Sequence, residues 1–305
     1  MNYPVKLLAI TFIFFLAFSG CSEKDTAKVG FLIHALDKER WENDKNYFVE
    51  KVRELEGTVD VRIAGNDPEK QLQQAEELLN DGVDVLVIIP VDQFAAAEIV
   101  EKAHQHDVKI ISYDRLIKNC KLDYYVSTDN VEIGKIQAEY LTRIKPRGNY
   151  ALIGGAESDN NSQFLYLGQM NVLQPLIESG DINVIYNEFT HSWSEEEGYQ
   201  HAKNILSLDQ EVDAIIAGND AIALGAVRAL KEAEKEEDVL VAGMDADLKN
   251  LHEIIAGHQT CTVYKPYKKL ASTAADLAMK MARCEECEET YQTVSNGAML
   301  VPAVF

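Results

Sequence analysis

Charged and amide side chains recur immediately after apolar, β-type runs in this 305-residue sequence. The clearest case is the run VKIISY at 108–113, which is followed by Asp114 and Arg115. A carboxylate that accepts hydrogen bonds, beside a guanidinium with five donors, suits a small polyhydroxylated ligand. The alternative is a structural ion pair at the end of the strand, since such pairs are common and stabilise little. The two residues alone leave both interpretations open.

Other polar residues stand at the same kind of place, just past an apolar run. They are Arg40, Asp159, Asn161, Asn219 and Asp245. The carboxyl ends of parallel strands form the ligand crevice of an open sheet, so we expect these side chains to meet there. Their neighbours Asn160, Asp220 and Asp247 are interpreted instead as N-caps of the helices that follow.

Two tryptophans accompany these positions. Trp193 stands between two serines in a polar loop, which indicates an exposed indole that could stack on the C–H face of a pyranose ring. Trp41 directly follows Arg40. It either offers a second apolar surface to the ligand or belongs to the core face of a helix.

The elements that must position these residues alternate along the chain. Strands are predicted at 29–34, 58–64, 83–89, 108–113, 149–153, 182–189, 213–217 and 239–244, and helices at 41–55, 68–80, 93–106, 129–144, 162–178, 195–206 and 221–233. The unbroken apolar run at 83–89 is typical of a strand buried on both faces of a parallel sheet. A similar Val-Asp-x-x-x run recurs at 212, so the alternation predicts an α/β fold of two similar, doubly wound lobes.

We assign the lobes from this pattern. The N-terminal lobe takes residues 29–126 plus about 266–290, and the C-terminal lobe takes 127–263 plus about 291–305, with a multi-strand hinge between them. Lys265 would lie where the chain crosses back to the first lobe. A lysine at that place reaches a ligand only when the lobes close.

The first twenty residues form an export signal. Lys6 precedes a short apolar stretch, and Ser19 and Gly20 stand directly before Cys21. This resembles a bacterial lipoprotein signal, in which Cys21 becomes the lipidated first residue and 21–28 a tether. The alternative is a soluble secretory signal cleaved nearby. Either way we expect an exported protein. In the lipoprotein interpretation, only the lipid on Cys21 attaches it to the membrane.

Charge and cysteine content exclude several other classes. The formal net charge of −21 argues against nucleic-acid binding. No P-loop, dinucleotide fingerprint, HExxH or GxSxG motif occurs, so no cofactor is expected. Cys284 and Cys287 form a lone C-x-x-C without further ligands at metal spacing, so a metal site is not expected. The sequence leaves open whether Cys284 and Cys287 form a disulfide or stay free. It also leaves open the redox state of Cys120 and Cys261.

At Arg40–Trp41, Asp114–Arg115 and Asp159-Asn-Asn161 the sequence resembles the periplasmic sugar-binding proteins of the ribose-binding (type I) fold, in particular the xylose-binding proteins of ABC transporters. The similarity covers about residues 29 to 302. It is carried in order by the segments GVDVLVIIP, SYDRLI, DNN before GQMNVLQP, AGNDA, GMDADL and TVYKP. The resemblance implies that Asp114, Arg115 and Asp245 contact a sugar.

Two departures from that family affect the expectation. The loop from His34 to Lys38 differs, so the rim near Arg40 could favour another pentose. The sequence also stops at Phe305, soon after Val301 and Pro302, whereas the family continues through a further strand and tail. Either the sequence is a fragment or this lobe lacks an edge strand.

Three functions are compatible with such a site. The first is the monosaccharide-binding component of an ABC importer, with D-xylose as the expected sugar. The second is a sensory protein whose closed form signals to a membrane histidine kinase or chemoreceptor. The third, a sugar hydrolase using Asp114, Asp159 or Asp245, is disfavoured because Arg, Lys and amide partners would keep these carboxylates ionised. We therefore expect no enzyme activity.

Overall fold

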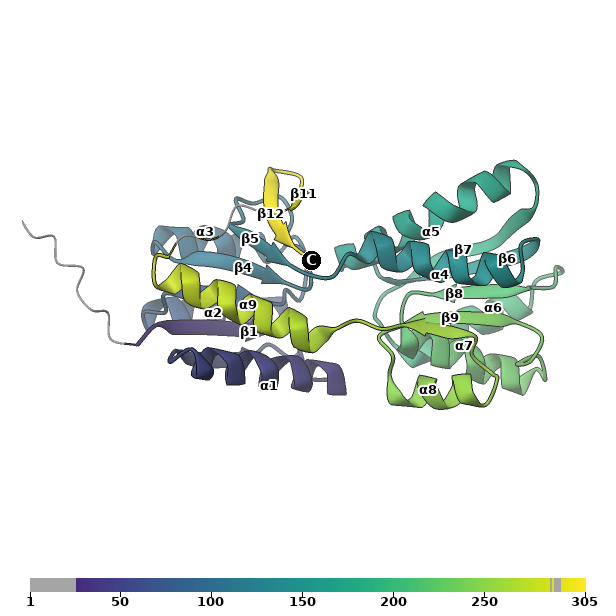
Figure 1. Ribbon diagram of the computed structural model, residues 1–305, viewed down its shortest axis with the longest axis horizontal. Coiled ribbons are helices and arrows are strands. Elements are labelled where there is room, and N and C mark those ends of the chain that lie inside the picture. Colours follow the sequence, from purple (N-terminus) through teal and green to yellow (C-terminus); the bar gives the residue numbers. More distant parts are fainter. Residues whose placement is uncertain (1–25, 286, 288–291) are drawn as a thin grey trace, which may run out of the picture.

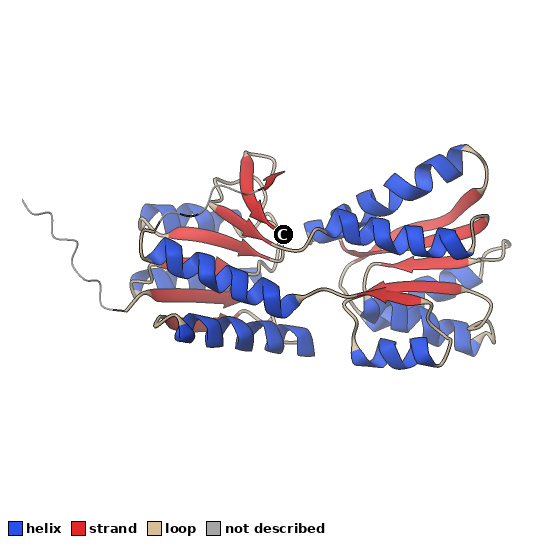
Figure 2. Cartoon of the chain, in the orientation of Figure 1, coloured by secondary structure: helices blue, strands red, loops and turns tan. Residues whose placement is uncertain are grey.

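The computed structural model describes residues 26–285, 287 and 292–305, and the predicted signal, Cys21 and most of the tether lie outside this range. The chain forms two lobes, each a mainly parallel sheet with helices on both faces (Figures 1 and 2). The first sheet has the strand order β11-β12-β5-β4-β3-β1-β2 and the second β10-β9-β8-β6-β7. This confirms the predicted α/β class with two doubly wound lobes.

The bounds of the first-lobe elements are β1 (Lys28–Ile33), α1 (Glu39–Glu54), β2 (Thr58–Ile63), α2 (Pro68–Asn80), β3 (Val85–Ile88), α3 (Ala97–Gln105), β4 (Lys109–Tyr113), β5 (Tyr124–Val126), α9 (Tyr267–Ala282), β11 (Gln292–Ser295) and β12 (Leu300–Val304). Alternate residues of β1 enter different cores. Phe31 packs with α1 and α9, whereas Leu32 packs with α2 and α3. This two-sided burial explains the continuous apolar runs of the inner strands.

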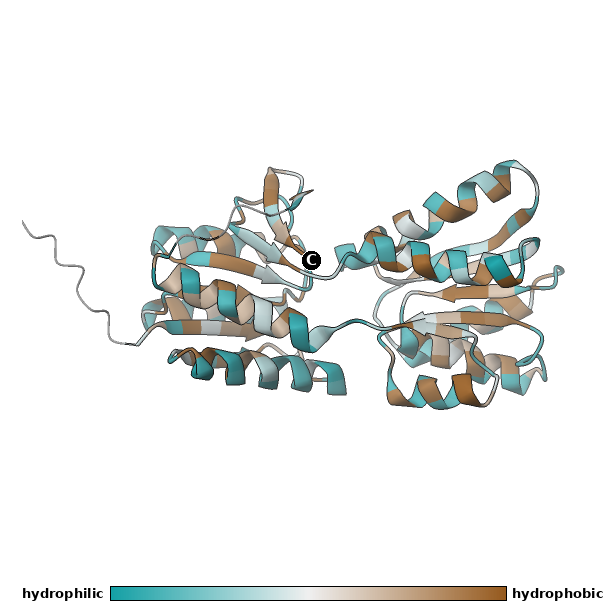
Figure 3. Cartoon of the chain, in the orientation of Figure 1, coloured by the Kyte–Doolittle hydropathy of each residue, from teal (hydrophilic) through white to brown (hydrophobic). Residues whose placement is uncertain are grey.

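The second-lobe elements are α4 (Asn130–Ile144), β6 (Gly148–Ala156), α5 (Asn160–Glu178), β7 (Ile182–Thr190), α6 (Glu195–Leu206), β8 (Ala214–Ala217), α7 (Asp220–Glu232), β9 (Leu240–Met244), α8 (Leu248–Ile255) and β10 (Cys261–Val263). Ile215 of β8 packs with α6 and α7, and its neighbour Ile216 packs with α4 and α5. Figure 3 shows the consequence, with largely hydrophobic strands between helices of mixed character.

The predicted placement of about residues 291–305 in the C-terminal lobe is wrong for 292–305, the part that the structure describes. β12 pairs in parallel with β5 of the first sheet, and β11 pairs antiparallel with β12. Val301 and Ala303 are buried in the first-lobe core, which explains why this segment lies there. Within the described residues the chain therefore passes between the lobes after β5 and after β10, at 127–129 and 264–266.

Cys120, Cys261, Cys284 and Cys287 are all free thiols in the structure. Among the described helices, none combines the length and apolar character that a membrane span requires. The residues that the structure describes contain no cluster of His, Cys, Asp or Glu arranged to hold a metal ion.

A buried carboxylate, Asp220, ties together the loops at the cleft end of the second lobe. Asp220 is fully buried and accepts hydrogen bonds from the Asp247 backbone N–H (2.9 Å), the Thr262 hydroxyl (2.9 Å) and the Gln259 amide (3.2 Å). It thus joins the start of α7 to the loop before α8 and to β10. That loop carries Asp245, whose φ of 111° lies in the left-handed region.

This arrangement predicts a pH-dependent stability. Burial raises the pKa of Asp220 to about 7, against the lowering effect of its hydrogen bonds. The folded state therefore holds the proton more tightly than the unfolded chain. The stabilisation is complete below about pH 4 and is lost as the pH rises through about 7, by on the order of 4 kcal/mol. Urea unfolding at successive pH values should show this loss in the native protein, and Asp220→Asn should remove it. An unchanged pH profile in the variant would contradict the assignment.

Candidate ligand-binding site

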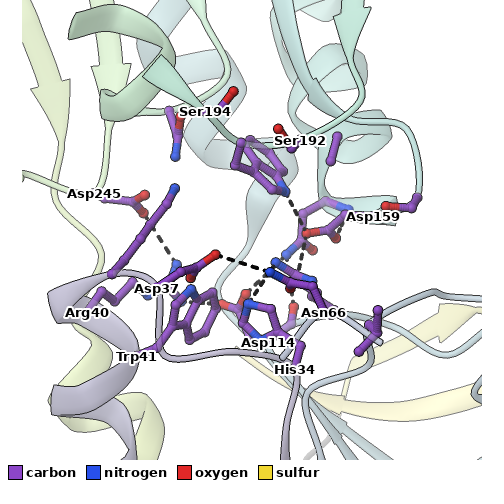
Figure 4. A pocket seen from close by; sticks show the side chains of 18 of the residues that line it. His34, Asp37, Arg40, Trp41, Asn66, Asp114, Asp159, Ser192, Ser194 and Asp245 are labelled. Carbon is purple, nitrogen blue, oxygen red and sulfur yellow. Dashed lines mark hydrogen bonds and ion pairs between the residues drawn. The ribbon is translucent and has the colours of Figure 1, made fainter. Parts of the chain in front are cut away.

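A cavity of about 460 Å³ lies between the two lobes, within the range of small-ligand pockets. All ten residues predicted from the sequence line it: Arg40, Trp41, Asp114, Arg115, Asp159, Asn161, Trp193, Asn219, Asp245 and Lys265. In Figure 4 the labelled side chains of the two lobes face one another across it. Most come from loops at the carboxyl ends of strands, as expected, and Lys265 comes from the second crossing between the lobes. Arg40 and Trp41 lie instead in the first turn of α1, and Asn161 lies in the first turn of α5.

The backbone at Asp114 is held in an uncommon conformation. Its φ is 61°, a left-handed value that costs energy for a residue other than glycine. Its carbonyl accepts three hydrogen bonds, from the Tyr125 hydroxyl (3.0 Å), the Ser127 hydroxyl (2.8 Å) and the Asn161 amide (3.1 Å). These donors hold the turn that directs Asp114 into the cavity.

The Asp114 carboxylate is matched by two cations. Oδ1 accepts from Arg40 at 2.5 Å and from Lys265 at 3.2 Å, and Oδ2 accepts from the Asn161 amide at 3.3 Å. Burial alone would raise the pKa of Asp114, but Arg40 and Lys265 outweigh it and hold the pKa below its usual range. Asp114 is therefore a permanently ionised acceptor. Lys265, 1% exposed, already reaches the site from the crossing between the lobes.

Arg40 links the two lobes. One terminal nitrogen contacts Asp114, and the other lies 3.4 Å from Asp245 across the cavity. Its guanidinium also lies over the Trp41 ring, 4.3 Å from the centroid. Trp41 is 5% exposed, which confirms the interpretation as a core residue. It also lines the cavity, and its contact with a ligand stays a prediction.

Arg115 forms a second contact between the lobes. Its Nε lies 2.9 Å from Asp159 Oδ2, and its two terminal nitrogens contact the Pro90 carbonyl (3.2 Å) and His34 Nε2 (3.3 Å). Arg115 is thus paired with the opposite lobe rather than with its sequence neighbour Asp114.

Asp159 combines a structural and a site role. Its carboxylate accepts from the Asn161 backbone N–H at the start of α5, so Asp159 is the N-cap there. The prediction that Asn160 caps this helix is wrong, because the Asn160 amide oxygen accepts instead from Leu116 N–H of the first lobe at 2.8 Å. The other Asp159 oxygen accepts from the Trp193 indole N–H at 3.1 Å. Burial raises the pKa of Asp159, although Arg115 opposes it.

Trp193 is half-buried rather than exposed. Its ring lies on Gly155, where a Cβ would come within 2.0 Å of the indole, so only glycine leaves room for it. The hydrogen bond to Asp159 fixes the other edge. The ring therefore forms a rigid wall of the cavity.

Asn219, not the predicted Asp220, is the N-cap of α7. Its side-chain oxygen accepts from Ile222 N–H at 3.1 Å, which leaves the amide nitrogen to donate into the cavity. Asp247 does occupy the N-cap position of α8, but its side chain makes no capping hydrogen bond there.

The structure adds lining residues that sequence reasoning did not select. They are His34, Asp37, Lys38, Asn66, Val91, Ala156, Ser158, His191, Ser192, Ser194 and Met244. Several lie in the loop after β1, which the sequence had marked only as unusual.

Burial lowers the pKa of His34, and neighbouring Arg115 lowers it further, so the imidazole is neutral. Its Nε2 then accepts from Arg115.

Comparisons with known proteins agree with this architecture. A family model described as a periplasmic binding protein domain matches residues 29–286. The D-xylose-binding periplasmic protein of Haemophilus influenzae is 40% identical over 94% of this chain and 86% of its own length. The multiple sugar-binding periplasmic receptor of Rhizobium radiobacter is 31% identical over 97% and 89%.

A solved structure extends the comparison. The ABC transporter solute-binding protein of Clostridium phytofermentans, with bound β-D-glucose, superimposes with a TM-score of 0.85 at 28% identity, covering 90% of this chain and 91% of that one. These relatives are binding proteins rather than enzymes, and they confirm the resemblance seen in the sequence motifs. Because the family match takes in most of both lobes, the chain belongs to the periplasmic binding protein family.

Proposed function

We propose that this protein captures a monosaccharide, D-xylose, between its lobes. The observation that carries the proposal is the alternation of fixed donors and acceptors from both lobes around one cavity, together with the names of the relatives. Asp114 and Asp245 accept from sugar hydroxyls, and Arg40, Arg115 and Lys265 donate to hydroxyl and ring oxygens. Trp193 packs against the C–H face of the ring. Charge-assisted hydrogen bonds of this kind are the strong ones.

Binding and closure are coupled in this proposal. A sugar that contacts groups of both lobes stabilises the closed form by its differential affinity for that form. Arg40–Asp245 and Arg115–Asp159 already draw the lobes together, so the ligand adds to existing contacts between the lobes. The loop from His34 to Lys38 borders the cavity, so another pentose is the alternative ligand.

The closed form would deliver its sugar to an ABC importer, since a solved relative is a solute-binding protein of an ABC transporter. The second candidate is a sensory role with a membrane kinase or chemoreceptor, favoured by the relative named as a receptor. Uptake of labelled xylose by cells separates the two. Deleting the gene should abolish high-affinity uptake for an importer component and leave it intact for a sensor.

The ligand assignment is tested by thermal unfolding of the protein from Ser22 onward with xylose, ribose, arabinose, galactose or glucose. A sugar at a hundredfold excess over its dissociation constant should add about 2.7 kcal/mol to the folded state. We expect the largest shift with xylose. Asp114→Asn and Asp245→Asn should each weaken binding by tenfold or more, because each removes a charged acceptor. Asp276→Asn, an exposed carboxylate on α9 outside the cavity, is the matched control.

Two results would overturn the assignment. One is the absence of a shift with any of the five sugars. The other is a xylose shift of equal size in native protein, Asp114→Asn and Asp245→Asn, since a ligand that ignores both carboxylates does not occupy this cavity.

We also propose that the protein is exported and anchored to the cell envelope by a lipid on Cys21. The support is the signal-like segment before Cys21 and the periplasmic names of the relatives. Cells grown with labelled palmitate should label the native protein and not Cys21→Ser, which should leave the membrane fraction. Label retained by Cys21→Ser would contradict lipidation at this residue.

A further inference from the structure

Beneath the cavity, α1 carries a second carboxylate that the binding scheme above does not use. Asp44 lies one helical turn after Arg40, is fully buried and is not part of the cavity wall. A buried carboxylate is costly unless it is paired and hydrogen-bonded, so its partners indicate its role.

The partners of Asp44 belong to the site. Its Oδ2 forms an ion pair with Arg40 Nε at 3.4 Å, and neither atom makes a hydrogen bond. Its Oδ1 accepts from the Tyr113 hydroxyl at 2.8 Å, and Tyr113 precedes Asp114 in the chain. The four residues thus form a closed circuit, since Arg40 in turn contacts Asp114. The circuit joins one turn of α1 to the end of β4.

With this circuit, each nitrogen of the Arg40 guanidinium has a carboxylate partner. Nε faces Asp44 in the interior, and the two terminal nitrogens face Asp114 and Asp245 at the cavity. A guanidinium is planar, so fixing Nε fixes the direction of the other two nitrogens. Without an anion at Asp44, both carboxylates that still attract Arg40 lie on its cavity side.

We propose that Asp44 is a positioning residue for the sugar site, which holds the Arg40 guanidinium from the interior so that its terminal nitrogens are presented to the ligand. The inference rests on the proposed sugar-binding function and names a residue that does not touch the sugar itself.

The same geometry makes sugar affinity depend on pH. Burial raises the pKa of Asp44 to about 6, whereas Arg40 and the Tyr113 hydrogen bond lower it. The titratable and charged groups that face Asp44 come from its own helix, from β4 and from the segment entering α9: Arg40, Tyr113, Asp114, Lys265 and Tyr267. Protonation of Asp44 removes the anion that holds Nε. Affinity should therefore be full above about pH 7 and fall as the pH drops through about 6.

The test measures xylose affinity by calorimetry from pH 5 to 8 in the full chain and its variants. Asp44→Asn keeps the shape and the Tyr113 contact but not the charge, so we expect about tenfold weaker binding at pH 7.5 and a flatter pH profile. Tyr113→Phe removes a hydrogen bond that favours the ionised form, so the midpoint of the profile should move to higher pH. Val52→Ala, a fully buried core residue further along α1, should lower stability without changing affinity.

The outcomes are distinct. If Asp44→Asn binds xylose within twofold of the native protein with the same pH profile, Asp44 is only a structural residue and the inference fails. If Asp44→Asn does not fold, the test rests on Tyr113→Phe. The inference then fails if the pH midpoint of xylose affinity is the same in Tyr113→Phe as in the native protein. If the native protein binds no sugar at any pH, the proposed function itself fails, and this inference with it.

Discussion

The structure of the site depends on the ion cluster around Asp114. One carboxylate in a left-handed turn at the end of β4 is contacted by Arg40 from α1, by Lys265 from the crossing into α9 and by Asn161 from the second lobe. Three segments that are distant from β4 in sequence therefore converge on one side chain. Its charge offsets the cost of burying two cations, which water would otherwise solvate far better. Removing that charge would take the carboxylate partner from Lys265 and leave Arg40 with Asp44 and Asp245 alone, so site and local fold depend on the same residue.

The charged wall of the cavity is balanced. Four cations line it, Lys38, Arg40, Arg115 and Lys265, and so do four carboxylates, Asp37, Asp114, Asp159 and Asp245. An anionic or cationic ligand would disturb this balance and face a like charge nearby. A neutral ligand with many hydroxyl groups can insert its donors and acceptors without changing the net charge. The cavity wall can thus suit an uncharged sugar although the protein is strongly acidic overall.

Most strands and the ten predicted cavity residues could be predicted from the sequence, because long apolar runs and the residues just past them are local signals. The run at 83–89 predicted β3, and the position of Asp114 after 108–113 predicted its place in the cavity. The three-residue strands β5 and β10 escaped prediction, since they are too short to show a period. The final segment was assigned to the wrong lobe because its partner, β5, lies 178 residues earlier in the chain, as the pairing of Ala303 with Tyr125 shows.

Side-chain pairing was the part that local patterns could not supply. Sequence reasoning placed Arg115 beside Asp114, but the fold pairs it with Asp159, because the strand end turns Asp114 toward Arg40 and Lys265 instead. Asp44 lies in the polar run ENDK, typical of an exposed helix surface, and is buried only because Arg40 and Tyr113 supply its partners. A buried charge on an apparently polar helix face becomes recognisable once its partner is known to belong to a site. Residues of this kind extend a binding site inward, beyond the side chains that can touch its ligand.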